Sequence, residues 1–262
     1  MQSLAIVRTY FRLGLINFVQ YRADFFIAVV NAFIQILSQV LAIAVIFNQT
    51  DSLKGWSRDD LIVLAGVQLV VGGVLGIVIR PSMQAFMESI RLGTFDFLLT
   101  KPADSQLLAS VQSVAPQAIT QFLIGIGVII TGLMLQGTSV AFSSLLLFAM
   151  LLLAGIAMVY SFMMVLATFT FWFVKLDNIL VIFNTMFGNA GSWPITIYPG
   201  WLRVSLTFII PIAFAVTVPS EALLGRVTWQ NVLLTLALAT LFVLVARKFW
   251  TYAIRHYTGA SA

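Results

Sequence analysis

The chain has 262 residues, of which 61% are hydrophobic and 9% are charged, against about 25% charged residues in a soluble domain. This composition excludes an ordinary soluble protein and predicts an integral membrane protein. The chain has no cysteine, which excludes disulfides, thiolate metal sites and cysteine nucleophiles. The net charge of +5 collects at the ends of apolar segments, so it indicates membrane topology rather than nucleic-acid binding.

Residues 1–24 predict an amphipathic helix that lies in the membrane interface. Apolar residues recur three or four apart from Leu4 to Phe18, while arginines stand off this stripe. The alternative is a helix packed against the cytosolic surface of the protein itself. The first long apolar run begins only near Phe25 and exceeds a signal-peptide h-region of about 7–15 residues, so a cleaved signal peptide is not expected.

Six apolar segments are long enough to cross a bilayer, whose hydrocarbon core needs about 20 residues of helix. The second carries Gly72 and Gly76 in a GxxxG spacing, which lets helices approach closely. Amide side chains in the spans either line a transport path or bond neighbouring helices; the path-lining candidates are Gln35, Gln39, Gln68, Gln121 and Asn184. The predicted spans are 25–47, 61–79, 107–135, 145–174, 179–198 and 229–247.

Residues 80–105 form the one long polar interruption that is itself patterned. Apolar residues recur at helical spacing from Met83 to Ile90, Gly93 is a natural helix stop, and Pro102 closes a short apolar stretch. The pattern predicts an amphipathic helix, a tight turn, a short second helix and a break. We interpret this loop as the contact for another protein; the alternative is an ordinary solvated loop.

Residues 199–226 are expected to enter the membrane from the outer face and to return. The apolar run from Val204 to Val218 is short for a span, and Pro211 interrupts it. With six spans and both ends cytoplasmic, the outer segments hold four of the 14 basic residues and the inner segments hold the other ten. A seventh span would place the basic carboxyl-terminal tail outside.

The sequence offers little chemistry of its own. It contains no GxxxxGK[ST], HExxH or GxSxG motif, and its one histidine, His256, lies in the basic tail. No span has a charged residue near its centre, which argues against a proton relay or an ion-coupled carrier. If the chain pumps a substrate, another protein must supply the energy.

Two segments resemble the ABC type-2 exporter permeases. Ile90 to Leu108 resembles the G-x-hydrophobic-D-x-L-L-x-x-P segment that follows the second span in this family. Tyr198 to Gly225 resembles the family's outer re-entrant region, in which a Tyr-Pro, an Ile-Pro and a Val-Pro pair recur. The matching positions are Gly93, Phe95, Asp96, Leu98, Leu99 and Pro102 in the first segment, and Tyr198-Pro199, Ile210-Pro211 and Val218-Pro219 in the second.

The resemblance implies one exporter transmembrane domain over residues 1–262, in the bacterial cytoplasmic membrane. It implies a second permease, identical or homologous, and two ATPase subunits that bind ATP and Mg; this chain binds no cofactor or metal and is no enzyme. The implied cargo is a lipid, a glycan or another amphiphile, moved outward. The alternative is a passive channel or a structural membrane subunit without an ATPase partner.

The resemblance also implies which residues act. The ATPase-coupling contact is predicted in the loop 80–105, and the outer re-entrant region supplies a second group of residues. The coupling residues are Arg91, Gly93, Phe95, Asp96, Phe97, Leu98, Leu99, Lys101 and Pro102, and the outer residues are Tyr198, Pro199, Pro211, Pro219 and Glu221.

Overall fold

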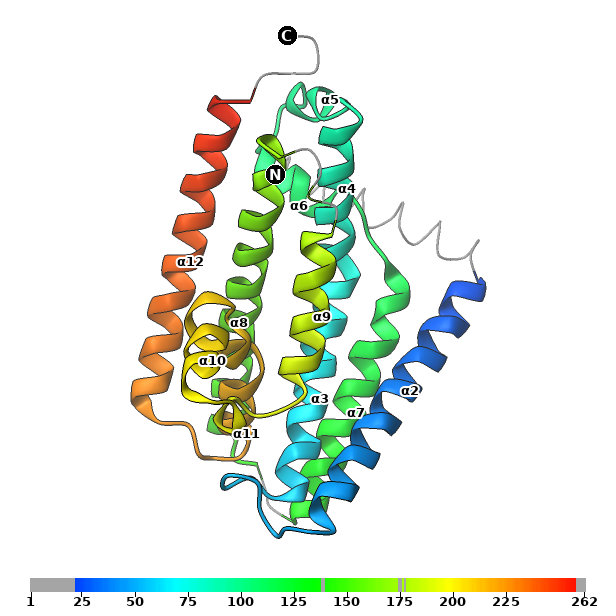
Figure 1. The fold of residues 1–262 in the computed structure, drawn as a ribbon, viewed down its shortest axis with the longest axis vertical. Coiled ribbons are helices and arrows are strands. Elements are labelled where there is room, and N and C mark those ends of the chain that lie inside the picture. The colour runs from blue at the N-terminus through cyan, green and yellow to red at the C-terminus, as the bar shows by residue number, and fades with distance from the viewer. Residues whose placement is uncertain (1–21, 138–139, 174–175, 177, 258–262) are drawn as a thin grey trace.

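The computed structural model describes residues 22–137, 140–173, 176 and 178–257, which form helices joined by short loops and contain no β-strand. Figure 1 shows these helices along one long axis. The predicted interfacial helix at 1–24 lies outside the described residues except for 22–24, which belong to α2. In chain order the elements are α2 (Arg22–Phe47), α3 (Arg58–Val74), η1 (Leu75–Ile79), α4 (Arg80–Arg91), α5 (Asp96–Leu99), α6 (Ser105–Val111), η2 (Pro116–Ala118), α7 (Ile119–Gln136), α8 (Phe142–Thr168), η3 (Phe169–Phe171), α9 (Ile179–Gly191), η4 (Ile195–Ile197), α10 (Gly200–Val204), η5 (Ser205–Ile209), η6 (Ala213–Thr217), α11 (Val218–Leu223) and α12 (Trp229–Arg255).

Within the described residues, five helices are long and apolar enough to cross a membrane, or six if one bent helix pair counts as a span. This confirms a multi-pass, all-helical membrane protein. The five stretches are Phe25–Phe47, Arg58–Arg91, Pro116–Gln136, Phe142–Phe171 and Trp229–Arg255.

Helix α3 lies at the centre of the molecule. Every residue from Asp60 to Gly73 is buried. Its closest neighbour is α7: a Cβ added to Gly66 would lie 2.7 Å from the backbone N of Ile129, and one added to Gly73 would lie 2.6 Å from that of Phe122. Moving from Gly66 to Gly73 on α3, the contacted residue moves from Ile129 back to Phe122 on α7, so the two helices are antiparallel.

Glycines of α7 allow the same close approach from the other side. A Cβ on Gly125 would lie 2.7 Å from the backbone N of Val70. Gly72 and Gly76, the pair that the GxxxG spacing singled out, also face α7 and η2, but an added Cβ there would first meet side chains. The closest backbone contacts therefore involve glycines that the GxxxG pattern did not mark.

Three wide helical turns stand before three prolines. The π-helices η1, η5 and η6 each end two residues before Pro81, Pro211 or Pro219. A proline ring clashes with the carbonyl four residues earlier and has no N–H to donate. In each case the residue just before the proline donates its N–H five residues back, which opens the turn to admit the ring.

The wide turn at Pro81 keeps α3, η1 and α4 in one helical run, Arg58–Arg91. The freed carbonyl of Ile77 accepts a hydrogen bond of 2.8 Å from the backbone N of Ala115. The helix of the second span therefore continues through α4 to Arg91.

The third span begins later than predicted. The segment expected at 107–135 is divided into α6 and the helix Pro116–Gln136. Pro116 disfavours helical geometry in the residue before it, and Ala115 accordingly has φ −117° and ψ 82°. Residues 112–115 therefore leave the helix.

The fifth span is shorter than predicted. The segment expected at 179–198 contains α9, which has 13 residues and ends at Gly191. It is followed by two limbs, Gly200–Ile209 and Ala213–Leu223, bent by 74° at Pro211. Figure 1 shows both limbs in the lower half of the molecule. One limb packs closely on α8, since a Cβ on Gly155 would lie 2.6 Å from the Cα of Ala215.

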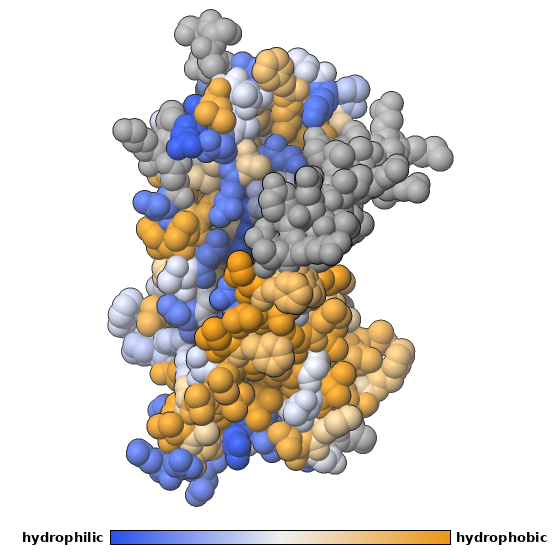
Figure 2. Space-filling model, turned by 90° about the vertical axis from the view of Figure 1, so that its right-hand side faces the viewer, coloured by the Kyte–Doolittle hydropathy of each residue, from blue (hydrophilic) through white to orange (hydrophobic). Residues whose placement is uncertain are grey.

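Figure 1 shows the elements α4 to α6 and the end of α12 in the upper half of the molecule, and the start of α2 at about mid-height. Figure 2 shows a broad hydrophobic surface on the lower part of the α2 side. Exposed apolar residues such as Phe33 and Leu37 are suited to contact with lipid.

Replacing Gly125 with alanine should destabilise the protein, because its new methyl group would lie 2.7 Å from the backbone of Val70. Overpacking of this kind costs about 1–3 kcal/mol. The matched control is Gly127→Ala on the same helix, where an added Cβ meets nothing within 4 Å. Thermal unfolding of the purified protein should show a lower midpoint for Gly125→Ala alone; equal midpoints would contradict the close packing.

Candidate functional site

The connection between α4 and α6, residues 92–104, has the predicted order of elements. Helix α4 ends at Arg91, and Gly93 follows with a φ of +69°, which favours glycine. The backbone N of Thr94 donates to the carbonyl of Ser89 at 2.8 Å and closes the turn. After α5, Asp104 caps α6 by accepting from the backbone N of Leu107 at 3.0 Å. The predicted helix, turn, short helix and break are therefore confirmed.

Five aromatic rings pack beneath this connection. We call Phe86, Phe95, Phe171, Trp250 and Tyr257 the aromatic cluster. The ring of Phe95 lies 5.4 Å from those of Phe86 and Phe171 and 5.5 Å from that of Tyr257, in edge-to-face contacts. Phe86 and Phe95 are fully buried, and Trp250 is 1% exposed. The cluster joins the turn before α5 to α4, η3 and α12.

The predicted coupling residues divide into an inner and an outer set. Phe95 and Leu98 are buried, so the structure assigns them to the support of the connection rather than to its surface. Phe97 is 72% exposed and Leu99 is 37% exposed. Leu92, which sequence reasoning missed, is 63% exposed; its place just after the end of α4 is the signal that marks it.

The polar coupling candidates have roles within the chain. Arg91 pairs with Glu88 at 2.6 Å on the same helix. Asp96 accepts a hydrogen bond from Tyr257. Burial raises the pKa of the Tyr257 hydroxyl, and the charge and hydrogen bond of Asp96 raise it further. Lys101 and Pro102, which follow α5 in the chain, are exposed.

An ion pair fastens the connection to α12. The two terminal nitrogens of Arg247 donate to the two carboxylate oxygens of Asp104, at 2.6 and 3.1 Å. Arg247 also donates to the Oε1 of Gln106 at 2.9 Å, and Trp250 donates to Ser105 at 3.2 Å. On the α8 side, Tyr160 bonds Ser110 at 2.8 Å. The connection and α6 are therefore bonded to both α12 and α8.

Two predicted path residues hold the end of α9. Gln39 donates through Nε2 to the carbonyl of Ser192, and Gln68 donates to that of Gly188, each at 2.9 Å. The last carbonyls of a helix lack partners in that helix, and inside a membrane no water replaces them. Gln39 is 7% exposed and Gln68 is 3% exposed. Their Oε1 atoms, like Oδ1 of Asn184, have no hydrogen-bond partner in the described part of the chain.

The other two path residues meet across α2 and α7. Gln121 donates to the Oε1 of Gln35 at 3.4 Å. Both line a cavity of about 250 Å³, together with Asn31 and Gln117, which sequence reasoning missed. Asn31 precedes Gln35 by one helical turn, a spacing that is visible in the sequence. Four of the five predicted residues thus form two groups, Gln39 with Gln68 and Gln35 with Gln121, and no hydrogen bond joins Asn184 to either group in the described part of the chain.

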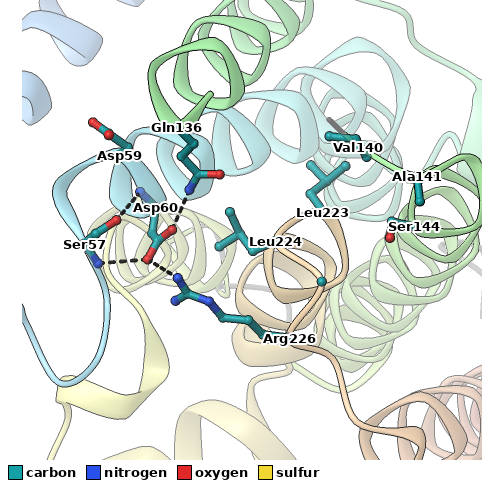
Figure 3. Close-up of a pocket in the computed structure, with 11 residues that line it drawn as sticks. Ser57, Asp59, Asp60, Gln136, Val140, Ala141, Ser144, Leu223, Leu224 and Arg226 are labelled. Atoms are coloured by element: carbon teal, nitrogen blue, oxygen red, sulfur yellow. Dashed lines mark hydrogen bonds and ion pairs between the residues drawn. The ribbon is translucent and has the colours of Figure 1, made fainter. Parts of the chain in front are cut away.

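An ion pair between the buried Asp60 and the half-exposed Arg226 closes the opposite end of the molecule (Figure 3). Asp60, at the start of α3, is 1% exposed and lies 2.8 Å from Arg226, which follows α11. Gln136 of α7 donates to the same carboxylate, as does the backbone N of Ser57 in a capping box. A cavity of about 470 Å³ opens beside them. The S-x-x-D spacing predicts the cap, but nothing in the sequence indicates the partner Arg226.

The predicted outer residues form hydrogen bonds, cap a helix or follow wide helical turns. Tyr198 donates to the carbonyl of Ala190 at 3.2 Å, and Pro199 stands at the N-cap of α10. Pro211 and Pro219 follow two of the wide turns described above. Glu221 is half-buried in α11 and accepts a hydrogen bond from Asn231.

The chain matches a known family along almost its whole length. The family model, described as ABC-2 family transporter protein, aligns with residues 9–261. A comparison with curated proteins gives no match. The aligned region covers the α4–α6 connection, the two amide groups and the ion pair of Asp60 alike.

Replacing Phe95 with alanine should destabilise the protein by about 3–5 kcal/mol, the usual cost of emptying a buried aromatic site. Phe97→Ala, two residues away but 72% exposed, should leave stability nearly unchanged. Thermal unfolding of the two purified variants gives the comparison. Similar midpoints for both would show that the aromatic cluster does not support the connection.

The ion pair of Asp104 should make stability depend on pH. Hydrogen bonding by Arg247 holds the pKa of Asp104 below its ordinary 3.8. The pair therefore contributes above pH 3.8, and its contribution is lost as the pH falls through the lower folded-state pKa.

Asp104→Asn keeps a capping side chain and should lower the unfolding midpoint at neutral pH. Because the pair is solvent-exposed, we expect a loss of at most about 1 kcal/mol. The difference from wild type should narrow below pH 3.8. Asp51→Asn, at an exposed loop position, is the control; a difference for Asp104→Asn that does not change with pH would argue against the ion pair.

Proposed function

Because the chain belongs to the ABC-2 transporter family, we propose that it is the permease subunit of an ATP-driven exporter in the bacterial cytoplasmic membrane. Two separate ATPase subunits supply the energy, and a second permease, identical or homologous, completes the path. The cargo is a lipid, a glycan or another amphiphile. ATP and Mg bind to the ATPase subunits and not to this chain.

Three exposed apolar residues of the α4–α6 connection, Leu92, Phe97 and Leu99, carry this proposal, and we call them the ridge. Figure 1 shows α5 at one end of the molecule. Exposed apolar residues grouped on a small element are typical of protein–protein contacts. Phe95, in the same connection, is buried and holds these residues in a fixed position. A surface that receives force from another protein needs such a fixed position.

The helices joined to the connection are arranged to transmit movement. Helix α4 belongs to the same helical run as α3, the buried centre of the bundle. The ion pair between Asp104 and Arg247 leads to α12 by a second route. An ATPase that moves the connection would therefore displace α3 and α12 together, and with them the helices packed on each.

The distribution of basic residues supports the orientation. The connection and both ends of the chain lie in the cytoplasm if the basic residues obey the positive-inside tendency. The ion pair between Asp60 and Arg226 then lies at the outer end, and the bent pair of limbs around Pro211 enters from outside and returns. This orientation places the ridge where an ATPase can reach it.

Phe97→Ala should weaken binding of the ATPase subunits that co-purify with the chain. Loss of a central apolar contact typically costs about 2 kcal/mol or more, so we expect at least a tenfold weaker complex. Stimulation of ATP hydrolysis should fall in parallel, with the unfolding midpoint unchanged.

The matched control is Trp229→Ala, an aromatic residue that is 73% exposed at the opposite end of the molecule. It should leave ATPase binding and stimulation at the wild-type level. The proposal is overturned if no ATPase co-purifies with the wild-type chain, which would favour a passive channel, or if Phe97→Ala and Trp229→Ala behave alike.

A further inference from the structure

The cavity between α2 and α7 has a polar lining. It measures about 250 Å³ and lies beside Gly76 of η1. Four primary amides line it, from Asn31, Gln35, Gln117 and Gln121, and the remaining lining residues are small. No described residue of the lining is charged. The cavity is therefore polar, neutral and about as large as eight waters at about 30 Å³ each.

Most of the hydrogen-bonding capacity of these amides is unused. Each primary amide has two N–H donors and one carbonyl acceptor. The described residues show one bond among the four side chains, from Gln121 to Gln35 at 3.4 Å. Donors and acceptors without partners at membrane depth are costly. The cavity therefore suits an occupant that both donates and accepts hydrogen bonds.

Two further amides are buried on α2 and α3 and do not line the cavity themselves. Gln39 follows Gln35 by one turn of α2, and Gln68 lies on the neighbouring α3. Both are more than nine-tenths buried, and their Nε2 atoms donate to carbonyls of α9. This fixes their Oε1 atoms as acceptors, and both lack a partner in the described chain. The cavity residue Gln35 therefore stands one helical turn from an amide whose acceptor oxygen has no partner in the described chain.

The outer surface of α2 suits an acyl chain. Val30, Phe33, Ile34 and Leu37 are all more than half exposed along this helix. They alternate with the cavity-lining residues along the same stretch of α2. Figure 2 shows the corresponding side of the molecule, where a column of hydrophilic residues descends to about mid-height beside hydrophobic surface. An amphiphile can therefore place its head in the cavity and its chain on α2.

We propose that this cavity binds the uncharged, hydroxyl-rich head group of an amphiphile, such as the sugar of a glycolipid. A hydroxyl group donates and accepts, which matches the free groups of the amides. A phosphate or an ammonium group would enter the cavity without a counter-charge from its lining. The inference rests on the proposed function only where it identifies this amphiphile with the exported cargo.

Native mass spectrometry of the purified chain tests the proposal. The probes are monoglucosyl diacylglycerol, diacylglycerol and phosphatidic acid with the same acyl chains. We expect the glucosyl lipid to be retained at least tenfold more than either of the others. Equal retention of the three lipids would overturn the site, as would a preference for phosphatidic acid.

Variants then locate the binding. Gln35→Leu and Gln121→Leu should each reduce retention of the glucosyl lipid at least tenfold, while Gln230→Leu, at an exposed position on α12, should not. Asn31→Leu is the second test, because Asn31 is exposed on α2 and its replacement leaves the packing intact. Wild-type retention in the three cavity variants would overturn the assignment.

This outcome is separate from that of the proposed function. The mass measurement uses the permease alone, so it does not depend on an ATPase partner. A chain that retains the glucosyl lipid but co-purifies with no ATPase would contradict the exporter and leave the binding site in place.

Discussion

Every backbone N–H and C=O within a bilayer must find its partner inside the protein, and two breaks in the helices of this chain show how carbonyls find theirs. Helix α9 ends after 13 residues, and the amides of Gln39 and Gln68 take up its last carbonyls. The carbonyl of Ile77, released near Pro81, is taken up by the backbone of Ala115. Broken segments are therefore held by side chains and loops from other helices, which couples their positions.

The second organising feature is the helical run Arg58–Arg91. One of its ends is fixed by the ion pair of the buried Asp60 with Arg226, and the other leads into the aromatic cluster around Phe95. Between them, glycine contacts bring the backbones of α3 and α7 into close approach. The run extends from the lower to the upper end of the molecule in Figure 1, and the proposed transmission of movement depends on this continuity.

The connection between α4 and α6 follows this helical run and has a buried side and an exposed side. Its apolar side chains are sorted, with Phe95 and Leu98 inside and Phe97 and Leu99 outside. The inner pair gains the free energy of burial, and the outer pair supplies the exposed surface on which the proposed ATPase contact rests. The amides of the cavity are likewise the polar groups on which the proposed head-group site rests.

Local chemistry made much of this architecture predictable. Apolar runs mark the spans, Gly93 marks a turn and Asp104 a cap, because each acts on the backbone beside it. The sequence could not tell Phe95 from Phe97, since both are phenylalanines in one short apolar stretch. Burial was decided by the arrival of distant rings such as Trp250 around Phe95, and a contact between residues far apart along the chain leaves no mark in the pattern of either segment.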